Sequence, residues 1–156
     1  MKALINLITH LATGVAGFVL GIYMLPLLTQ EEGPSDEKLQ AHASQAVYQA
    51  EFHRDLEDSD WLHWGEGKVS VSDEFVSFDG ELAPGPDYRL YLVPEFVETE
   101  AGFNAIKGMS KHIGDVDSFE DFMVAVPEGV DVHQYSTVVV WCESFGQFIT
   151  AAQYKF

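Results

Sequence analysis

The sequence predicts an all-β domain, an antiparallel β-sandwich or barrel, preceded by an N-terminal transmembrane helix and a short amphipathic helix. The first observation is an N-terminal segment, residues 3–28, that contains no Asp, Glu, Lys or Arg. The second is a stretch after Ser35 whose apolar residues recur at helical spacing. The third begins at Gly67, where apolar and polar residues start to alternate and short runs end at Gly or Pro. Short strands with little helix between them are typical of a sandwich or barrel.

The N-terminal segment predicts a single crossing of a membrane. Residues 3–28 are 26 residues long, and about 20 apolar helical residues are enough to cross the roughly 30 Å of bilayer hydrocarbon. A signal peptide has a shorter apolar region followed by a small-x-small cleavage site, and no Ala-x-Ala follows Leu28. We therefore expect residues 1–28 to be an uncleaved signal anchor, with cleavage as the alternative.

The charges that flank this segment predict its orientation. Lys2 precedes the segment, whereas Glu31, Glu32 and Asp36 follow it. Positive charge is retained on the cytoplasmic side of a membrane. We therefore expect a single-pass protein of the cell membrane with a cytoplasmic N-terminus. Residues 30–156 then lie outside the cytoplasm, in the periplasm if the cell is Gram-negative.

The rest of the chain is strongly acidic. The sequence has 8 Lys and Arg against 25 Asp and Glu, a formal net charge of −17, and Lys2 is the only charged residue before Glu31. Residues 31–156 therefore carry 7 positive and 25 negative charges, a net of −18. Because such a surface repels phosphates, nucleic-acid binding is excluded. Solubility is the simplest role of this acidity, and a cationic partner or weak divalent-ion binding is the alternative.

Residues 29–51 are expected to form a linker and a stalk helix. Polar residues and the Gly33-Pro34 pair end the first helix, and Ser35 is suited to cap the next one. The apolar residues of the expected helix fall on one stripe, namely Leu39, Ala43, Ala46, Val47 and Ala50.

Residues 52–156 are expected to form the β domain. Trp61 and Trp64 precede the strands and are expected to pack in the core or at its rim. Three consecutive valines before Trp141 predict a strand that is buried on both faces. The stretch from 95 to 120 is less regular. The expected strands are Lys68–Ser72, Phe75–Phe78 with a turn at Asp79-Gly80, Tyr88–Val93, Phe122–Val126, Val138–Cys142 and Phe145–Tyr154.

The only cysteine, Cys142, ends the valine-rich strand. One cysteine cannot form a disulfide within the chain, so it is either buried and inert, reactive, or paired with another chain. Exchange between two thiols of one chain is excluded for the same reason. Sulfenic-acid formation, a mixed disulfide with a partner, and ligation of a metal or haem carried by a partner stay open. Glu143, the next residue, raises the pKa of the thiol if its carboxylate lies near the sulfur.

Three segments resemble the motifs of the DM13 domain family. Residues 85–92, with the sequence GPDYRLYL, are similar to its GPDL-x-VYL strand. Lys107-Gly108 and Val126-Pro127 follow in the order of its L-K-G and V/L-P elements, although the segment between them is longer here. Residues 138–145, with the sequence VVVWCESF, resemble its closing VVIWC-x-x-F. The resemblance covers residues 52–156, and its motif positions are Gly85, Pro86, Asp87, Tyr91, Lys107, Gly108, Pro127, Trp141 and Phe145.

The resemblance implies an all-β extracytoplasmic module with a part in electron transfer. DM13 domains occur in membrane proteins beside cytochrome and DOMON-type haem domains, and the redox role is given to the family's cysteine. In this sequence that residue is Cys142. The resemblance therefore implies a redox partner protein for a module that is attached to the membrane through residues 3–28.

The residues themselves require no cofactor and show no metal site. The sequence contains no Cys-x-x-Cys, Cys-x-x-Cys-His or His-x-x-x-His spacing. Gly-x-Ser-x-Gly is absent as well, so an accessory module is favoured over a stand-alone enzyme. Two functions stay open: a redox accessory domain that uses Cys142, and a non-catalytic binding or scaffolding β-sandwich in which Cys142 is structural. Haem or copper from a partner also stays open, with candidate ligands His53, His63, His112, His133, Met109, Met123 and Cys142.

Overall fold

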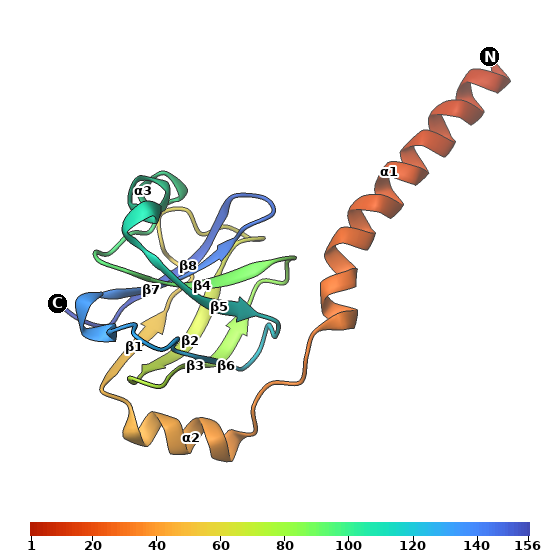
Figure 1. Ribbon diagram of the computed structural model, residues 1–156. Coiled ribbons are helices and arrows are strands. Elements are labelled where there is room, and N and C mark those ends of the chain that lie inside the picture. Colours follow the sequence, from red (N-terminus) through yellow and green to blue (C-terminus); the bar gives the residue numbers. More distant parts are fainter.

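The computed structural model describes residues 1–156 as a long N-terminal helix, a short helix and a β domain of two packed sheets (Figure 1). Each sheet is antiparallel and has four strands. The first sheet has the order β1-β2-β3-β6, and the second has the order β5-β4-β7-β8. Strand β1 lies beside β8 and strand β5 beside β6, so the sheets approach each other along both edges. The prediction of an antiparallel sandwich or barrel with preceding helices is confirmed.

The helices and strands have the following bounds. The helices are α1 (Lys2–Thr29), α2 (Asp36–Gln45) and α3 (Glu100–Ile106), with 3-10 turns η1 (Lys107–Met109) and η2 (Val132–Gln134). The strands are β1 (Tyr48–Phe52), β2 (Gly65–Val71), β3 (Phe75–Leu82), β4 (Tyr88–Val93), β5 (Lys111–Val116), β6 (Phe122–Ala125), β7 (Thr137–Cys142) and β8 (Gln147–Gln153).

Strand β7 is buried on both faces, as its valines predict. Val138, Val140 and Cys142 point into the main core between the two sheets. Val139 and Trp141 point the other way, into a second apolar cluster that α3 covers. A central strand that is packed on both faces needs apolar residues at every position, which explains the uninterrupted run.

The expected stalk helix is shorter than its apolar stripe. Helix α2 ends at Gln45, and Tyr48–Phe52 form strand β1, which pairs with β2 in antiparallel register. The prediction is therefore wrong for Ala46, Val47 and Ala50. The Val47 amide donates to the Val71 carbonyl oxygen at 2.9 Å, so pairing with β2 replaces a helical hydrogen bond. An alanine-rich stripe has little packing energy to oppose this pairing.

Three further expectations need correction. Strand β3 continues to Leu82, so Asp79-Gly80 is not a turn; Gly80 faces Gly67 of β2 instead. The stretch from 95 to 120, expected to be irregular, holds α3 and β5. Trp61 is not packed, because it is 83% exposed.

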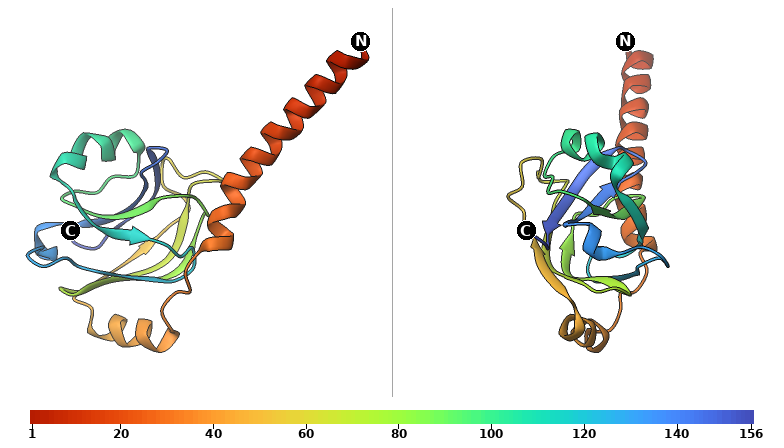
Figure 2. Two further views of the ribbon diagram at one scale, coloured as in Figure 1. Left: turned by 45° about the vertical axis from the view of Figure 1, so that its right-hand side comes forward. Right: turned by 60° about the vertical axis from the view of Figure 1, so that its left-hand side comes forward.

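Helix α1 is long and apolar enough to cross a membrane, by its length and composition. A signal sequence shares those properties. None of its residues is buried, but Ile22, Pro26 and Leu27 are half-buried where its C-terminal end meets the β domain. The rest of the helix projects away from the domain (Figure 2). The expected anchor segment is therefore a continuous helix with one end fixed against the β domain.

Candidate functional site

Cys142 lies at the end of β7, between two neighbouring strands. It pairs with Tyr88 of β4 on one side and with Gln147 of β8 on the other. The residue is only 3% exposed. Its Sγ donates a hydrogen bond to the Pro86 carbonyl oxygen at 3.0 Å. The loop that contains Pro86 therefore covers the thiol and accepts its proton in a hydrogen bond.

The surroundings of Cys142 favour the neutral thiol. Burial raises the pKa of the thiol, and the nearby carboxylates of Asp87 and Glu143 raise it further. The backbone amides of Phe145 and Ser144 favour the thiolate, but their effect is smaller than the sum of the others. A pKa above the ordinary value leaves the sulfur protonated at neutral pH, so it is a poor nucleophile in this conformation.

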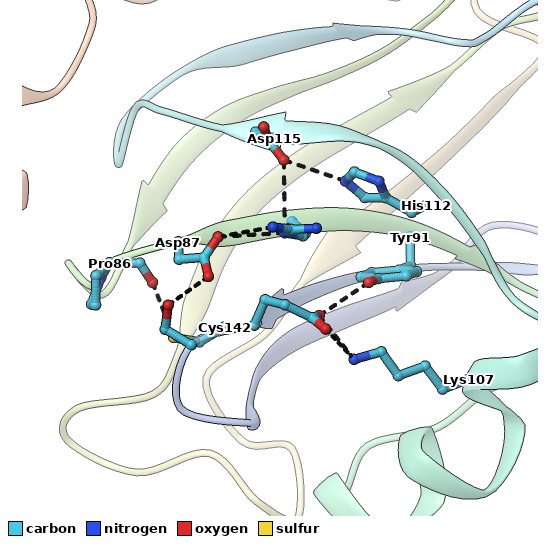
Figure 3. Close-up of polar contacts among 10 residues, drawn as sticks. Pro86, Asp87, Tyr91, Lys107, His112, Asp115 and Cys142 are labelled. Atoms are coloured by element: carbon cyan, nitrogen blue, oxygen red, sulfur yellow. Dashed lines mark hydrogen bonds and ion pairs between the residues drawn. The ribbon is translucent and has the colours of Figure 1, made fainter.

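Asp87 fixes the covering loop to the turn between β7 and β8. Its carboxylate accepts hydrogen bonds from the Ser144 hydroxyl at 2.6 Å and from the Arg89 guanidinium at 3.4 Å (Figure 3). Its carbonyl oxygen accepts from the Glu143 amide at 3.0 Å. The hydrogen bond from the Ser144 hydroxyl and, to a smaller extent, the Arg89 guanidinium lower the pKa of Asp87 below its usual range.

The backbone of this loop is specialised at two motif positions. Asp87 has a φ of 56°, in the left-handed region that residues other than Gly, Asn and Asp seldom adopt. A Cβ atom at Gly85 would lie 2.5 Å from the Tyr88 hydroxyl oxygen, so any larger residue would displace that ring. The Tyr88 hydroxyl in turn donates to the Ala83 carbonyl oxygen at 2.8 Å. The loop is therefore built around one tyrosine and one strained aspartate.

A second polar group lies directly after the thiol, at Glu143. The Lys107 ammonium is 2.8 Å from both carboxylate oxygens, and the Tyr91 hydroxyl donates to one of them at 3.1 Å (Figure 3). Lys107 lowers the pKa of Glu143, whereas burial and the bond to Glu143 raise the pKa of Tyr91 to about 12. The Lys107 ammonium also lies 5.1 Å from the centre of the Trp141 ring, in reach of a cation–π interaction.

A mainly apolar cavity of about 310 Å³ adjoins Cys142. Its lining comes from α1, from the loops before β2 and β4, from the turn between β7 and β8, and from strands β4, β7 and β8. A small ligand in this cavity would meet the thiol and only a few polar groups. The lining residues are Ile22, Tyr23, Leu62, His63, Pro84, Gly85, Pro86, Tyr88, Cys142, Phe145, Gln147 and Ile149.

The structure gathers most of the predicted site residues around Cys142-Glu143-Ser144 and leaves two outside. Pro86 and Asp87 contact this tripeptide directly, and so do Tyr91 and Lys107. Gly85 shapes the covering loop, Trp141 packs beneath Lys107, and Phe145 lines the cavity. Gly108 lies in η1 with open space around it, and Pro127 follows β6 in the other sheet.

Sequence reasoning missed three polar members of the site: Glu143 as an ion-pair partner, Ser144 and Arg89. Glu143 and Ser144 follow directly after a strand that is apolar throughout. Polar residues at that point mark the end of a buried strand and its turn, which is the signal that would have found them. Arg89 sits between aspartates, 3.4 Å from Asp87 and 3.9 Å from Asp115.

The histidines considered as metal or haem ligands are dispersed. No group of three or more His, Cys, Asp or Glu side chains is placed to hold a metal ion. His63 contacts Asp60, His112 contacts Asp115, and His133 contacts Asp73. Among the histidines, only His63 lines the Cys142 cavity.

Comparison with known proteins agrees with this geometry. A family model described as "Electron transfer DM13" matches residues 51–154, which is most of the chain. No curated protein and no solved structure matches the chain. The matched range includes the covering loop, the Lys107–Glu143 ion pair and the Cys142 strand. The chain therefore belongs to the DM13 family.

Proposed function

We propose that this protein is a membrane-anchored, extracytoplasmic electron-transfer module, in which Cys142 is the residue that a redox partner protein acts on. In this proposal residues 1–28 are the anchor, residues 29–51 connect it to the domain, and residues 52–156 form most of the DM13 domain. Strand β1 begins within the connecting segment and belongs to the first sheet. The module works as an accessory to its partner and not as a stand-alone enzyme.

One observation carries the proposal: family-motif residues from three separate segments meet at Cys142-Glu143-Ser144. The covering loop contributes Pro86 and Asp87, β4 contributes Tyr91, and η1 contributes Lys107. A buried cysteine that only filled space would need apolar neighbours and no hydrogen-bonded cover. Around this tripeptide lie instead a loop with left-handed backbone at Asp87, the Lys107–Glu143 ion pair and a cavity. Strained backbone is concentrated at functional sites of proteins.

The thiol must be uncovered before it can react. Oxidation to a sulfenic acid, a mixed disulfide with a partner, and ligation to a metal or haem iron that a partner carries all begin when Sγ loses its proton. In the closed conformation the Pro86 carbonyl oxygen and burial both retain that proton. The proposal therefore includes an opening of the Pro84–Asp87 loop, which Asp87 resists through Ser144 and Arg89.

A second candidate function is a binding or scaffolding module in which Cys142 is structural. The 3% exposure of Cys142 and the raised pKa of its thiol favour this alternative. The two functions differ in whether the native protein ever presents the sulfur to a reagent.

Alkylation of Cys142 in the full chain, held in a neutral detergent, distinguishes them. We expect native protein to react more slowly than urea-unfolded protein, with a rate that still rises at alkaline pH because the pKa of the thiol is raised. Asp87→Gly keeps the left-handed backbone accessible but removes the carboxylate, so it should accelerate labelling about tenfold or more. Asp87→Asn is the matched control, because Asn tolerates the same backbone and retains an acceptor for Ser144.

Native protein that is never labelled, in the wild type and in Asp87→Gly alike, would establish Cys142 as structural. The redox role also requires that Cys142→Ser abolish electron exchange in cells while the protein level stays normal. An unchanged cellular redox readout in that variant would favour scaffolding.

A further inference from the structure

Two exposed aromatic side chains belong to segments that line the Cys142 cavity. Trp61 is 83% exposed and Phe145 is 57% exposed. Phe145 lines the cavity from the turn between β7 and β8, and Leu62, the neighbour of Trp61, lines it from the loop before β2. Large apolar side chains that stay exposed on neighbouring segments of a small domain mark an interaction surface.

Helix α1 forms another wall of the same cavity. Ile22 and Tyr23 line it together with Leu62 and Phe145. A helix rises about 1.5 Å per residue, so residues 3–22 span about 30 Å, which is the thickness of bilayer hydrocarbon. An anchor that begins near Ala3 therefore leaves the hydrocarbon near Ile22. The cavity and its aromatic rim then lie at the level of the lipid headgroups.

The helix is held against the domain and cannot swing freely. Leu27 packs against the main core, and Ile22 and Pro26 are half-buried on the same side of the helix. Just beyond the helix, the Glu31 amide donates to the Asp117 carbonyl oxygen at 2.9 Å. Both views of Figure 2 show α1 rising past the end of the domain from this attachment. The direction of the helix therefore fixes which end of the domain faces the membrane.

We propose that Trp61, Leu62 and Phe145 form a membrane-seating surface that rests in the interfacial layer of the phospholipid bilayer, with the Cys142 cavity opening toward the lipid. This inference rests on the membrane anchor of the proposed function. Tryptophan favours the membrane–water interface because its ring is apolar and its N–H is polar. The contact covers the exposed Trp61 and holds the domain down on the membrane.

Charge determines which lipid this surface accepts. Asp58 and Asp60 precede Trp61 in the same loop. The Asp60 carboxylate accepts the amides of Leu62 and His63 at 2.7 and 2.8 Å, which keeps its charge close to the surface. An anionic lipid surface repels these carboxylates. The seating surface is therefore suited to zwitterionic lipid.

Fluorescence quenching in vesicles tests the seating. The full chain is reconstituted in phosphatidylcholine vesicles that contain lipids brominated near the headgroup, and the emission of Trp61 is isolated as the difference between wild type and Trp61→Phe. We expect the bromines to quench this component at least twofold and aqueous iodide to quench it weakly. Adding anionic phosphatidylserine should reduce the bromine quenching and increase that by iodide.

The matched control moves the fluorophore away from the seating surface. Phe156 is fully exposed at the C-terminus, far from α1 (Figure 1). Phe156→Trp in the Trp61→Phe background should be quenched by iodide and not by brominated lipid. Equal quenching of both tryptophans by iodide, with none by brominated lipid, overturns the seating surface.

Flotation of the same vesicles separates this inference from the proposed function. If the protein floats with the vesicles in alkaline carbonate but brominated lipid does not quench Trp61, the anchor is supported and the membrane-seating surface is refuted. Protein that does not float refutes the anchor, and the seating surface with it. Flotation together with bromine quenching of Trp61 supports both.

Discussion

At the scale of single residues, the ion pair after the thiol contributes more to local chemistry than to stability. The side chains of Lys107 and Glu143 are each about a third exposed. Pairs with this much solvent contact contribute about 1 kcal/mol or less to the free energy of unfolding. The same carboxylate, however, is a hydrogen-bond acceptor for the Tyr91 hydroxyl. Removing its charge should therefore change the titration of Tyr91 more clearly than the stability of the domain.

We predict that Glu143→Gln lowers the pKa of Tyr91 from about 12 toward the ordinary value for tyrosine. The pKa should stay above that value, because burial, the largest cause of the shift, is unchanged. The pH dependence of the ring carbon chemical shifts of labelled tyrosines measures this change, and Tyr91→Phe identifies the resonance. An unaltered Tyr91 titration in Glu143→Gln would contradict the observed hydrogen bond.

The sequence predicted single residues correctly where the residue type itself indicates the environment, as valine does for a buried strand. Three valines before Trp141 predicted a strand packed on both faces, and the structure confirms it. The partners of Glu143 were not predictable, because Tyr91 and Lys107 approach it only after β4 and η1 have been placed. The left-handed backbone of Asp87 was equally hidden, since its contacts with Glu143 and Ser144 form only after β7 has been placed.

At the scale of elements, the pairing of β2 with β3 depends on two facing glycines. Gly67 and Gly80 are directly opposite each other, and Gly67 has a φ of 143°. A Cβ atom at Gly80 would collide with the Glu66 carbonyl oxygen and with the Cα of Gly67. These contacts are with backbone, so a side-chain rotation cannot relieve them. The close approach explains why a glycine occurs inside a strand where the sequence suggested a turn.

Gly80→Ala is expected to reduce the free energy of unfolding by about 1–3 kcal/mol, the usual range for overpacking. Gly108→Ala is the matched control, because its Cβ would meet no atom within 4 Å. That variant should change the free energy of unfolding by no more than about 0.5 kcal/mol. Urea denaturation of the full chain in neutral detergent gives both values, and equal losses in the two variants would refute the steric argument.

Element prediction was weakest where pairing partners were distant in sequence. Residues 48–51 looked helical because Val47 and Ala50 continued the stripe of α2, yet β2 is in place to take the backbone hydrogen bonds of this segment. Strand β5 was missed because Gly114 and Asp115, residue types that disfavour strands, lie inside it, and only its pairing with β4 makes it a strand. The local sequence pattern predicts whether a segment with a strong preference is a helix or a strand. For a segment with a weak preference, pairing within the sheet determines its secondary structure.

At the scale of the whole molecule, the excess of negative charge opposes folding. The formal net charge is −17, and few of the 25 acidic residues have a basic partner. Compacting a chain of one charge sign raises its electrostatic self-repulsion. Added salt screens charges that are exposed and separated by more than about 10 Å. The domain should therefore be more stable in moderate salt than in very dilute buffer.

We predict that the melting temperature of the β domain rises by about 2–5 °C between low and moderate NaCl at neutral pH. Circular dichroism of the full chain in a neutral detergent follows the melting of the strands. Sodium sulfate at equal ionic strength is the control, because a pure screening effect is the same for both salts. A lower melting temperature in NaCl would show that the ion pairs outweigh the repulsion.

The fold class and the order of the segments were predictable from the sequence, because both depend on periodicity and composition along the whole chain. The cavity was not, because its lining comes from α1, from three loops and from strands β4, β7 and β8, which no local pattern brings together. The exposure of Trp61 was not predictable either, because an aromatic residue is usually packed, whereas this one is exposed in an acidic loop.

The contact of β1 with β8 joins the first and last strands of the domain. Contacts between residues far apart in sequence form late and slow the folding of a domain. A chain that emerges N-terminus first cannot complete the second sheet, or bring its β8 edge to β1, until residues 147–153 are available. If α1 is a signal anchor, the acidic chain therefore crosses the membrane before the domain can close, and the domain acquires its tertiary structure on the far side.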